Sequence, residues 1–342
     1  MKYIAAQYEG NHRLEFREKQ VPPLKDYDVL IRVAAATICG TDFHILEGKF
    51  PAKPPVVLGH EFSGYVEEVG LAVSTVKPGD LVTVEPHLFC GLCKYCRIGK
   101  EHLCLKKQGF GVRLDGGFAE YCVIPEKTVY KVPAGISPSV AALAENVGCC
   151  IHGIERARIR QGDFVVVLGG GFVGLIMAQL ARMNGASKVY VVEPNEYRLN
   201  TAAQRGFATI NPLRQRVEET IYEATSGLGA DVVIEAAGRI ETAEQSLRLV
   251  GRGGTVLFFG VVSPEQRMTV SPNDIYTREL TLVGSAINPY SHYKAVEKLA
   301  ELDLEPFITH RFPLRRIDEA FRTAQSGQCF KVAVCPNETH IR

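Results

Sequence analysis

Four cysteines lie within fifteen residues, at Cys90, Cys93, Cys96 and Cys104, in a C-x2-C-x2-C-x7-C pattern. Four thiolates at such spacing bind one Zn²⁺ tetrahedrally and fill its coordination shell. The pattern therefore predicts a structural zinc, and any zinc chemistry requires a second site. The alternative is a cluster of reduced thiols without metal.

A second set of ligands lies upstream, where Cys39 and the adjacent His60 and Glu61 offer sulfur, nitrogen and oxygen. Mixed sets of this kind are typical of zinc sites that keep one position open. Zn²⁺ lowers the pKa of a bound water from about 15.7 to about 7. An alcohol bound there would lose its proton in the same way, and the resulting alkoxide expels hydride readily.

A glycine pattern, Gly169-x-Gly171-x-x-Gly174, follows an apolar run and precedes a helical pattern, with Phe172 and Val173 inside it. Such glycines allow a tight turn, the approach of a pyrophosphate and close packing of helix on strand. The pattern predicts a dinucleotide site.

Glu193 ends the next strand-like run, 19 positions after Gly174. A carboxylate there binds ribose hydroxyls and repels a 2′-phosphate, so we expect NAD in preference to NADP. We also expect Arg198 to contact the cofactor. The alternative for Glu193 is a solvated charge at a strand end.

At 342 residues the chain is long enough for two domains. Short β segments with Gly and Pro precede residues 148–163, and strand-like runs alternate with helical patterns after them, which indicates a parallel sheet in an α/β fold. The expected strands of this sheet are 164–169, 188–193, 231–238, 255–260 and 280–285. The last 55 or so residues, with an amphipathic segment and a strand-like KVAVCP, are expected to return to the first domain.

The charge balance and the composition of the chain limit the kinds of binding partner to be expected. Lys plus Arg (39) nearly balances Asp plus Glu (38), which argues against nucleic acid or an acidic membrane surface and favours a small-molecule substrate. Ten cysteines without a recognisable leader predict a cytoplasmic location. Residues 164–181 carry no charge, but their glycines indicate strand, turn and helix, not a membrane span.

Several motifs together resemble the zinc-dependent medium-chain alcohol dehydrogenases. They are Cys39-Gly40-Thr41-Asp42, Gly59-His60-Glu61, the four-cysteine segment, Gly116-Gly117-Phe118-Ala119-Glu120-Tyr121 and the glycine pattern. The resemblance implies a GroES-like β-rich catalytic domain over 1–150, completed by 287–342, and a Rossmann domain with a doubly wound parallel sheet over 151–286. It also implies a catalytic zinc on Cys39 and His60, and a homodimer or homotetramer.

The third ligand of that zinc distinguishes subfamilies. In the segment AALAENVGCCIHG, the acidic position of polyol and threonine dehydrogenases falls on Glu145, and the cysteine position of simple-alcohol enzymes falls on Asn146. The chain thus resembles the sorbitol dehydrogenase branch, as does its Thr309–Leu314 segment. Whether Glu61 or Glu145 ligates directly stays open, and Cys149 and Cys150 are rival ligands.

The resemblance also assigns a proton relay. Thr41 is expected to take the substrate proton and His44 to pass it towards solvent, with an ordinary histidine pKa near 6.5 suited to the task. Asp42 is expected to orient His60 by accepting its second ring N–H. The alternatives are a turn residue for Thr41, a helix cap for Asp42 and a surface histidine for His44.

The expected activity is hydride transfer from a secondary alcohol of a polyol or sugar alcohol to NAD. The Arg-Tyr pair of sorbitol dehydrogenases is absent, because Ile287-Asn288-Pro289-Tyr290 stands in its place, so D-sorbitol itself does not follow. The alternatives are an L-threonine 3-dehydrogenase and a non-catalytic NAD-binding protein.

Overall fold

The computed structural model describes residues 1–337, which divide into two compact units. Unit 1 holds residues 1–148 together with the chain from Pro289 onward, and unit 2 is Cys149–Asn288. The chain passes from unit 1 to unit 2 within helix α4 (Ala144–Ala157) and returns after Asn288.

Unit 2 is built on a six-stranded parallel sheet in the order β13-β12-β11-β14-β15-β16. The strands are β11 (Phe164–Leu168), β12 (Lys188–Val192), β13 (Ala208–Ile210), β14 (Ala230–Glu235), β15 (Val250–Phe258) and β16 (Thr281–Gly284). The helices are α5 (Phe172–Met183), α6 (Glu196–Gln204), α7 (Val217–Ala224), α8 (Ile240–Leu249) and α9 (Pro272–Arg278). This order is that of a doubly wound dinucleotide-binding sheet, as predicted.

The valine-rich β11 explains why this sheet could be recognised. Val165, Val166, Val167 and Leu168 are all fully buried, which is the condition of a central parallel strand covered on both faces. By contrast, the sequence did not predict β13, because a strand of three residues is too short to show a periodic pattern of apolar residues.

Unit 1 contains a seven-stranded sheet in the order β10-β6-β5-β3-β18-β17, with β9 paired to β3. Its strands are β3 (Asp28–Thr37), β5 (Glu61–Val69), β6 (Leu81–Val84), β9 (Tyr121–Pro125), β10 (Val129–Lys131), β17 (Ile308–Pro313) and β18 (Lys331–Cys335). A three-stranded sheet holds β1 (Lys2–Tyr8), β2 (Leu14–Gln20) and β4 (Val56–Val57). The helices are α1 (Gly40–Leu46), α2 (Lys94–Arg97), α3 (Pro138–Ala141), α10 (His292–Lys298) and α11 (Ile317–Gln325), with short 3-10 turns at η1 (Glu101–Leu103), η2 (Glu126–Thr128), η3 (Glu305–Phe307) and η4 (Leu314–Arg316).

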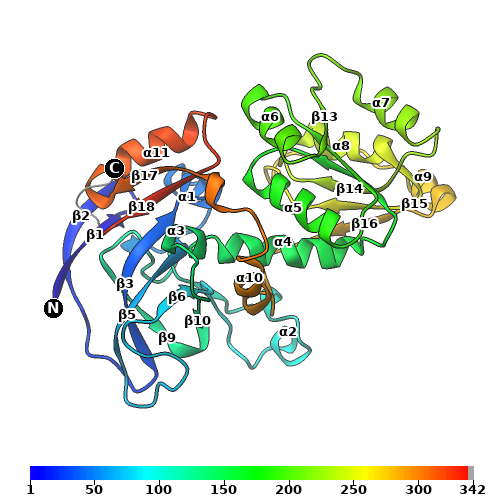
Figure 1. Ribbon diagram of the computed structural model, residues 1–342. Coiled ribbons are helices and arrows are strands. Elements are labelled where there is room, and N and C mark those ends of the chain that lie inside the picture. Colours follow the sequence, from blue (N-terminus) through cyan, green and yellow to red (C-terminus); the bar gives the residue numbers. More distant parts are fainter. Residues whose placement is uncertain (338–342) are drawn as a thin grey trace. The chain divides into compact units, whose positions relative to one another are not determined.

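The C-terminal segment returns to unit 1, where β18, red in Figure 1, lies beside the blue β3. Thr37 of β3 is paired with Ala333 of β18 on one side and with Glu61 of β5 on the other. Three strands from distant parts of the sequence therefore present side chains to one point.

The cysteine-rich segment forms a small lobe of unit 1, residues 87–109, between the paired strands β7 (His87–Leu88) and β8 (Gln108–Gly109). Leu92, Ile98 and Leu105 are exposed, so the lobe has almost no apolar core of its own. The uncharged stretch 164–181 forms β11 and most of α5, and no helix within residues 1–337 combines the length and apolarity that crossing a membrane requires.

Candidate active site and metal centres

Cys39, His60 and Glu61 come together in unit 1. Cys39 is the N-cap of α1, and Glu61 opens β5 directly after His60. Their ligand atoms all lie within 4.8 Å of one another. Because His60 and Glu61 are buried, the site is shielded from water on most sides.

The state of Cys39 supports a metal at this point. Burial, reinforced by the negative charge of Glu61, raises the pKa of the Cys39 thiol above its ordinary value. A thiolate here therefore requires positive charge close by, which a divalent cation supplies. A sulfur, an imidazole and a carboxylate fit Zn²⁺.

Glu61 is held on both oxygens. Its Oε2 accepts a hydrogen bond from Lys331 Nζ at 2.5 Å and another from the Thr37 hydroxyl, and its Oε1 accepts one from Asn146 Nδ2 at 2.6 Å. Burial alone would raise the pKa of Glu61, but the positive charges of Lys331 and His60 and these hydrogen bonds lower it to about 2. Glu61 is thus a buried carboxylate that stays ionised.

Neither Lys331 nor Thr37 was among the predicted site residues. The available signal was a lysine at the first position of the otherwise apolar KVAVC, a strand in which every residue is buried. A buried lysine requires a partner of opposite charge.

Glu145 lies in the first turn of α4 and is buried. It does not belong to the group of ligand atoms within 4.8 Å, but Asn146 Nδ2 reaches its Oε2 at 3.2 Å. Cys149 and Cys150 also lie outside that group, and Cys150 Sγ faces the carbonyl of Val173 at 4.0 Å.

Asp42 is fully buried, and its Oδ2 accepts a hydrogen bond from the Cys39 backbone N–H at 2.9 Å. Its Oδ1 lies 3.7 Å from His60 Nδ1, which is longer than the hydrogen bond expected from the sequence. Thr41 Oγ1 is 3.8 Å from Cys39 Sγ, and His44 is exposed on the same helix. Thr41 thus lies beside the Cys39 sulfur, whereas His44 lies on the exposed side of α1.

The four cysteines of the lobe also converge. Cys96 Sγ lies 3.9 Å from Cys90 Sγ and 3.6 Å from Cys93 Sγ, close to the ~3.8 Å edge of a tetrahedron with Zn–S bonds of about 2.3 Å. Backbone N–H groups of Cys96 and Leu105 lower the pKa of the Cys93 thiol to about 6. This arrangement fits a closed, structural zinc.

The glycine pattern joins β11 to α5 in unit 2. A Cβ on Gly174 would lie 1.8 Å from the carbonyl oxygen of Gly169, whereas a Cβ on Gly171 would meet only Arg198 Nη1, at 3.8 Å. Gly174 is thus required by packing, and Gly171, the N-cap of α5, leaves space beside the helix N-terminus. Backbone N–H groups at such a terminus bind phosphate. Phe172 and Val173 form the first turn of this helix.

Glu193 is buried just after β12, where its two oxygens accept the backbone N–H groups of Gly170 at 2.8 Å and Asn195 at 2.9 Å. The carboxylate therefore fixes the glycine loop, and each oxygen keeps a lone pair for a ribose hydroxyl. Within residues 1–337, Arg198 Nε is buried without a hydrogen-bond partner.

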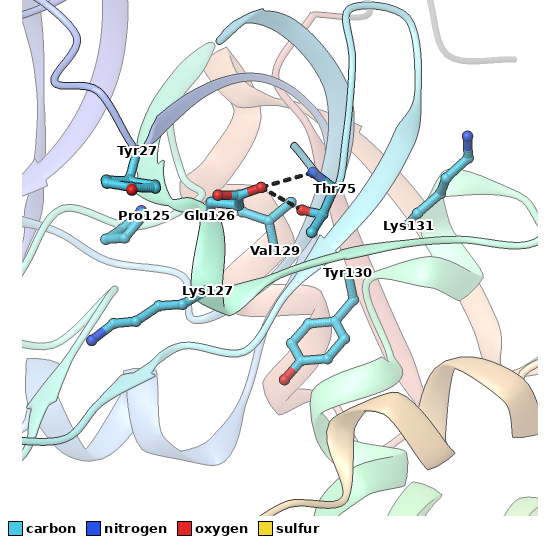
Figure 2. A pocket seen from close by; sticks show the side chains of 8 residues that line it. All are labelled: Tyr27, Thr75, Pro125, Glu126, Lys127, Val129, Tyr130 and Lys131. Atoms are coloured by element: carbon cyan, nitrogen blue, oxygen red, sulfur yellow. Dashed lines mark hydrogen bonds between the residues drawn. The ribbon is translucent and has the colours of Figure 1, made fainter. Parts of the chain in front are cut away.

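A surface hollow of about 800 Å³ in unit 1 contains none of these residues (Figure 2). Its polar groups are partly used by the protein itself, since Glu126 accepts hydrogen bonds from Thr75 at 2.7 and 2.9 Å and Lys131 pairs with Asp80 at 2.7 Å. We place the chemistry elsewhere.

Two family models match the chain: the alcohol dehydrogenase GroES-like domain over residues 25–134, and the zinc-binding dehydrogenase over residues 173–301. L-Threonine 3-dehydrogenase from Bacillus subtilis (strain 168) is 37% identical, over 93% of this chain and 94% of its own length. Sorbitol dehydrogenase from Halalkalibacterium halodurans is 32% identical, over 98% and 99%.

A solved structure of a zinc-binding dehydrogenase from Sinorhizobium meliloti 1021 bound to NADP has a TM-score of 0.95 and 37% sequence identity, covering 98% of this chain and 100% of that one. The predicted combination of a GroES-like domain with a parallel-sheet Rossmann domain is thereby confirmed, as are zinc and a nicotinamide dinucleotide as cofactors of the family. The chain belongs to the zinc-dependent medium-chain alcohol dehydrogenases.

Proposed function

We propose that this dehydrogenase oxidises a secondary alcohol of a polyol or sugar alcohol to the ketose or ketone, with NAD as hydride acceptor. The observation that carries the proposal is the carboxylate character of the site in unit 1. Asn146 occupies the position of the simple-alcohol cysteine and donates hydrogen bonds to Glu61 and Glu145. This site resembles the polyol and threonine branch in having carboxylates in place of a second thiolate.

In this proposal Cys39 and His60 hold the catalytic zinc together with a carboxylate. When bound, Zn²⁺ polarises the substrate oxygen and favours loss of its proton. Thr41 receives that proton on its hydroxyl, and His44 passes it to water. Asp42 fixes the backbone of Cys39 and lies against His60.

Gly169, Gly171 and Gly174 hold the dinucleotide, with Glu193 on the adenosine ribose. A buried carboxylate beside the loop supports NAD, because it repels a 2′-phosphate. The Sinorhizobium structure contains NADP, and Arg198 Nε is buried without a hydrogen-bond partner within residues 1–337. The activity with NAD should therefore be compared with the activity with NADP. We expect kcat/KM for NAD to exceed that for NADP at least tenfold; the reverse order would overturn this assignment of Glu193.

L-Threonine 3-dehydrogenase is the second candidate, favoured by the name of the 37% identical Bacillus subtilis relative. L-Threonine and a polyol both contain a secondary alcohol next to a carbon that bears a polar group. That group is an ammonium in L-threonine and a hydroxyl in a polyol. The distinction lies in what binds that neighbour and the carboxylate of threonine.

The deciding experiment is a rate measurement of NADH formation on a panel of polyols, vicinal diols and L-threonine, at equal concentration. The proposal predicts the highest kcat/KM for a polyol or diol. Preference for L-threonine by tenfold or more would replace it with the second candidate. Turnover of neither class would remove both.

We further propose that residues 1–150 with 287–342 form the catalytic domain and 151–286 the cofactor domain, and that the enzyme is a cytoplasmic homodimer or homotetramer. The support for assembly is that β16, at one edge of the parallel sheet, leaves backbone groups available for pairing with another copy. Sedimentation equilibrium measures the state directly.

A further inference from the structure

Asn146 occupies an unusual position between two carboxylates. It lies in the first turn of α4, is 6% exposed, and uses one nitrogen to contact Glu61 Oε1 at 2.6 Å and Glu145 Oε2 at 3.2 Å. Both contacts are to carboxylate oxygens, which accept, so the end of the amide that faces them is the NH₂ group. Its two hydrogens match the two acceptors.

This amide connects elements that are far apart in the sequence. Glu61 opens β5, and Asn146 lies 85 residues later on α4, where Glu145 is its immediate neighbour. Lys331 and Thr37 donate to Oε2 of Glu61, whereas Asn146 donates to Oε1, so the asparagine contributes to the orientation of the second oxygen. Glu61 belongs to the group whose ligand atoms lie within 4.8 Å of one another, so the orientation of its carboxylate bears directly on the metal site.

We propose that Asn146 is a positioning residue that sets how the two carboxylates face the catalytic metal, keeping Glu61 in its hydrogen-bonded arrangement while it holds Glu145 beside it. In this proposal Asn146 acts through Glu61 and Glu145, to which it donates its hydrogen bonds. The inference uses the zinc that the family implies, and it does not depend on which alcohol is oxidised. Partners that orient metal ligands in this way commonly change metal affinity or activity by about 10- to 100-fold when they are removed.

The test compares Asn146→Ala, which removes both hydrogen bonds, with Asn146→Asp, which keeps the shape but loses the donors. The matched control is Asn211→Ala in unit 2, where a buried asparagine donates to Glu196 Oε1, also at 2.6 Å. All three proteins and the parent are loaded with Co²⁺, and visible absorption and zinc-binding affinity are measured. The four-cysteine lobe binds metal in the same way in all four proteins. Its contribution to the absorption and to the measured affinity therefore cancels in the comparison.

We expect both Asn146 variants to bind the catalytic metal at least tenfold more weakly than the parent. Their cobalt bands should also differ from those of the parent, because the Glu61 and Glu145 carboxylates lose the hydrogen bonds that orient them. Asn211→Ala should match the parent in both measurements. Asn146→Asp spectra and affinities equal to those of the parent would overturn the proposal, even if Asn146→Ala folds poorly.

These readouts need no substrate, so a failure of the proposed polyol activity leaves them interpretable. A second readout is kinetic: kcat should fall in the Asn146 variants, while KM for the dinucleotide stays within twofold. A change confined to KM for the dinucleotide would also contradict a role at the metal.

Discussion

Lys331 and Glu61 form a buried ion pair, with side-chain exposures of 7% and 0%. Burial lowers the pKa of a lysine, yet the charges of Glu61 and Cys39 raise that of Lys331 overall. The lysine therefore stays charged and compensates the negative charge that accumulates around Cys39. This pair makes a buried carboxylate tolerable next to a thiolate.

Replacing Lys331 by methionine should destabilise the protein, because it leaves the Glu61 charge buried without its cation. We expect the free energy of unfolding in urea to fall by about 3 kcal/mol. The control is Lys2→Met, which removes a pair of similar length with Glu18, at 2.6 Å. Its side chains are 72% and 56% exposed, so this substitution should change the free energy of unfolding little. Equal effects of the two substitutions would show that Lys331 contributes no more than a surface ion pair.

Glu85 is a second buried acid at the residue scale, located just after β6. Burial raises its pKa to about 8, and His87 Nδ1 lies 3.4 Å from its Oε1. The folded protein therefore holds the proton of the Glu85 carboxyl more tightly than the unfolded chain does. At pH values between the ordinary glutamate pKa and about 8, unfolding releases this proton. Stability from this group is complete at low pH and is lost as the pH rises through that window.

Glu85→Gln imitates the protonated acid at every pH and should remove this loss. We expect the variant to equal the parent near pH 5 and to exceed it by roughly 3 kcal/mol at pH 8. Urea unfolding at several pH values measures the difference. Parallel stability curves would mean that Glu85 is ionised in the folded protein.

At the scale of elements, local pattern identified the parts of unit 2 whose burial is continuous, namely β11, α5, β12 and β14. It missed β13, which is too short, and β1 and β2, whose pairing is seen only in the folded sheet. Ligand types and spacing in the sequence also suggested that Cys39, His60 and Glu61 act together. The sequence pattern could not predict the contact between Glu61 and Lys331, which are 270 residues apart. The periodicity of apolar residues identifies a strand but does not tell which other strand it pairs with.

The turn between β11 and α5 separates two uses of glycine. Gly174→Ala should fail through packing, since its Cβ would collide with the Gly169 carbonyl at 1.8 Å, and we expect a drop in melting temperature without any ligand. Gly171→Ala has space for its Cβ and should melt like the parent, yet bind NADH at least tenfold more weakly, because the methyl occupies the path of the pyrophosphate. Thermal melts and NADH fluorescence titration measure both. Normal melting of Gly174→Ala, or normal binding by Gly171→Ala, would contradict these assignments.

At the scale of the whole molecule, unit 1 carries both groups of metal ligands within residues 1–337, and they have opposite surroundings. The Cys39 site is embedded in the seven-stranded sheet, whose cohesion comes from a large apolar core. The lobe exposes Leu92, Ile98 and Leu105 and depends on its four thiolates instead. One metal is therefore expected to matter for chemistry and the other for folding.

Two cysteine substitutions should separate these dependences, each lowering bound zinc from two ions to one per chain. Cys93→Ser removes a lobe ligand, so the lobe loses the contacts that replace its missing core, and we expect a lower melting temperature and protease cleavage within residues 90–105. Cys39→Ser leaves the sheet core intact, so it should melt within a few degrees of the parent, bind NADH normally and show no turnover. Metal analysis, melting and limited proteolysis are read on the same preparations. Turnover by Cys39→Ser at the parental kcat would remove this metal from the reaction, and an undisturbed lobe in Cys93→Ser would show that residues 87–109 fold without their zinc.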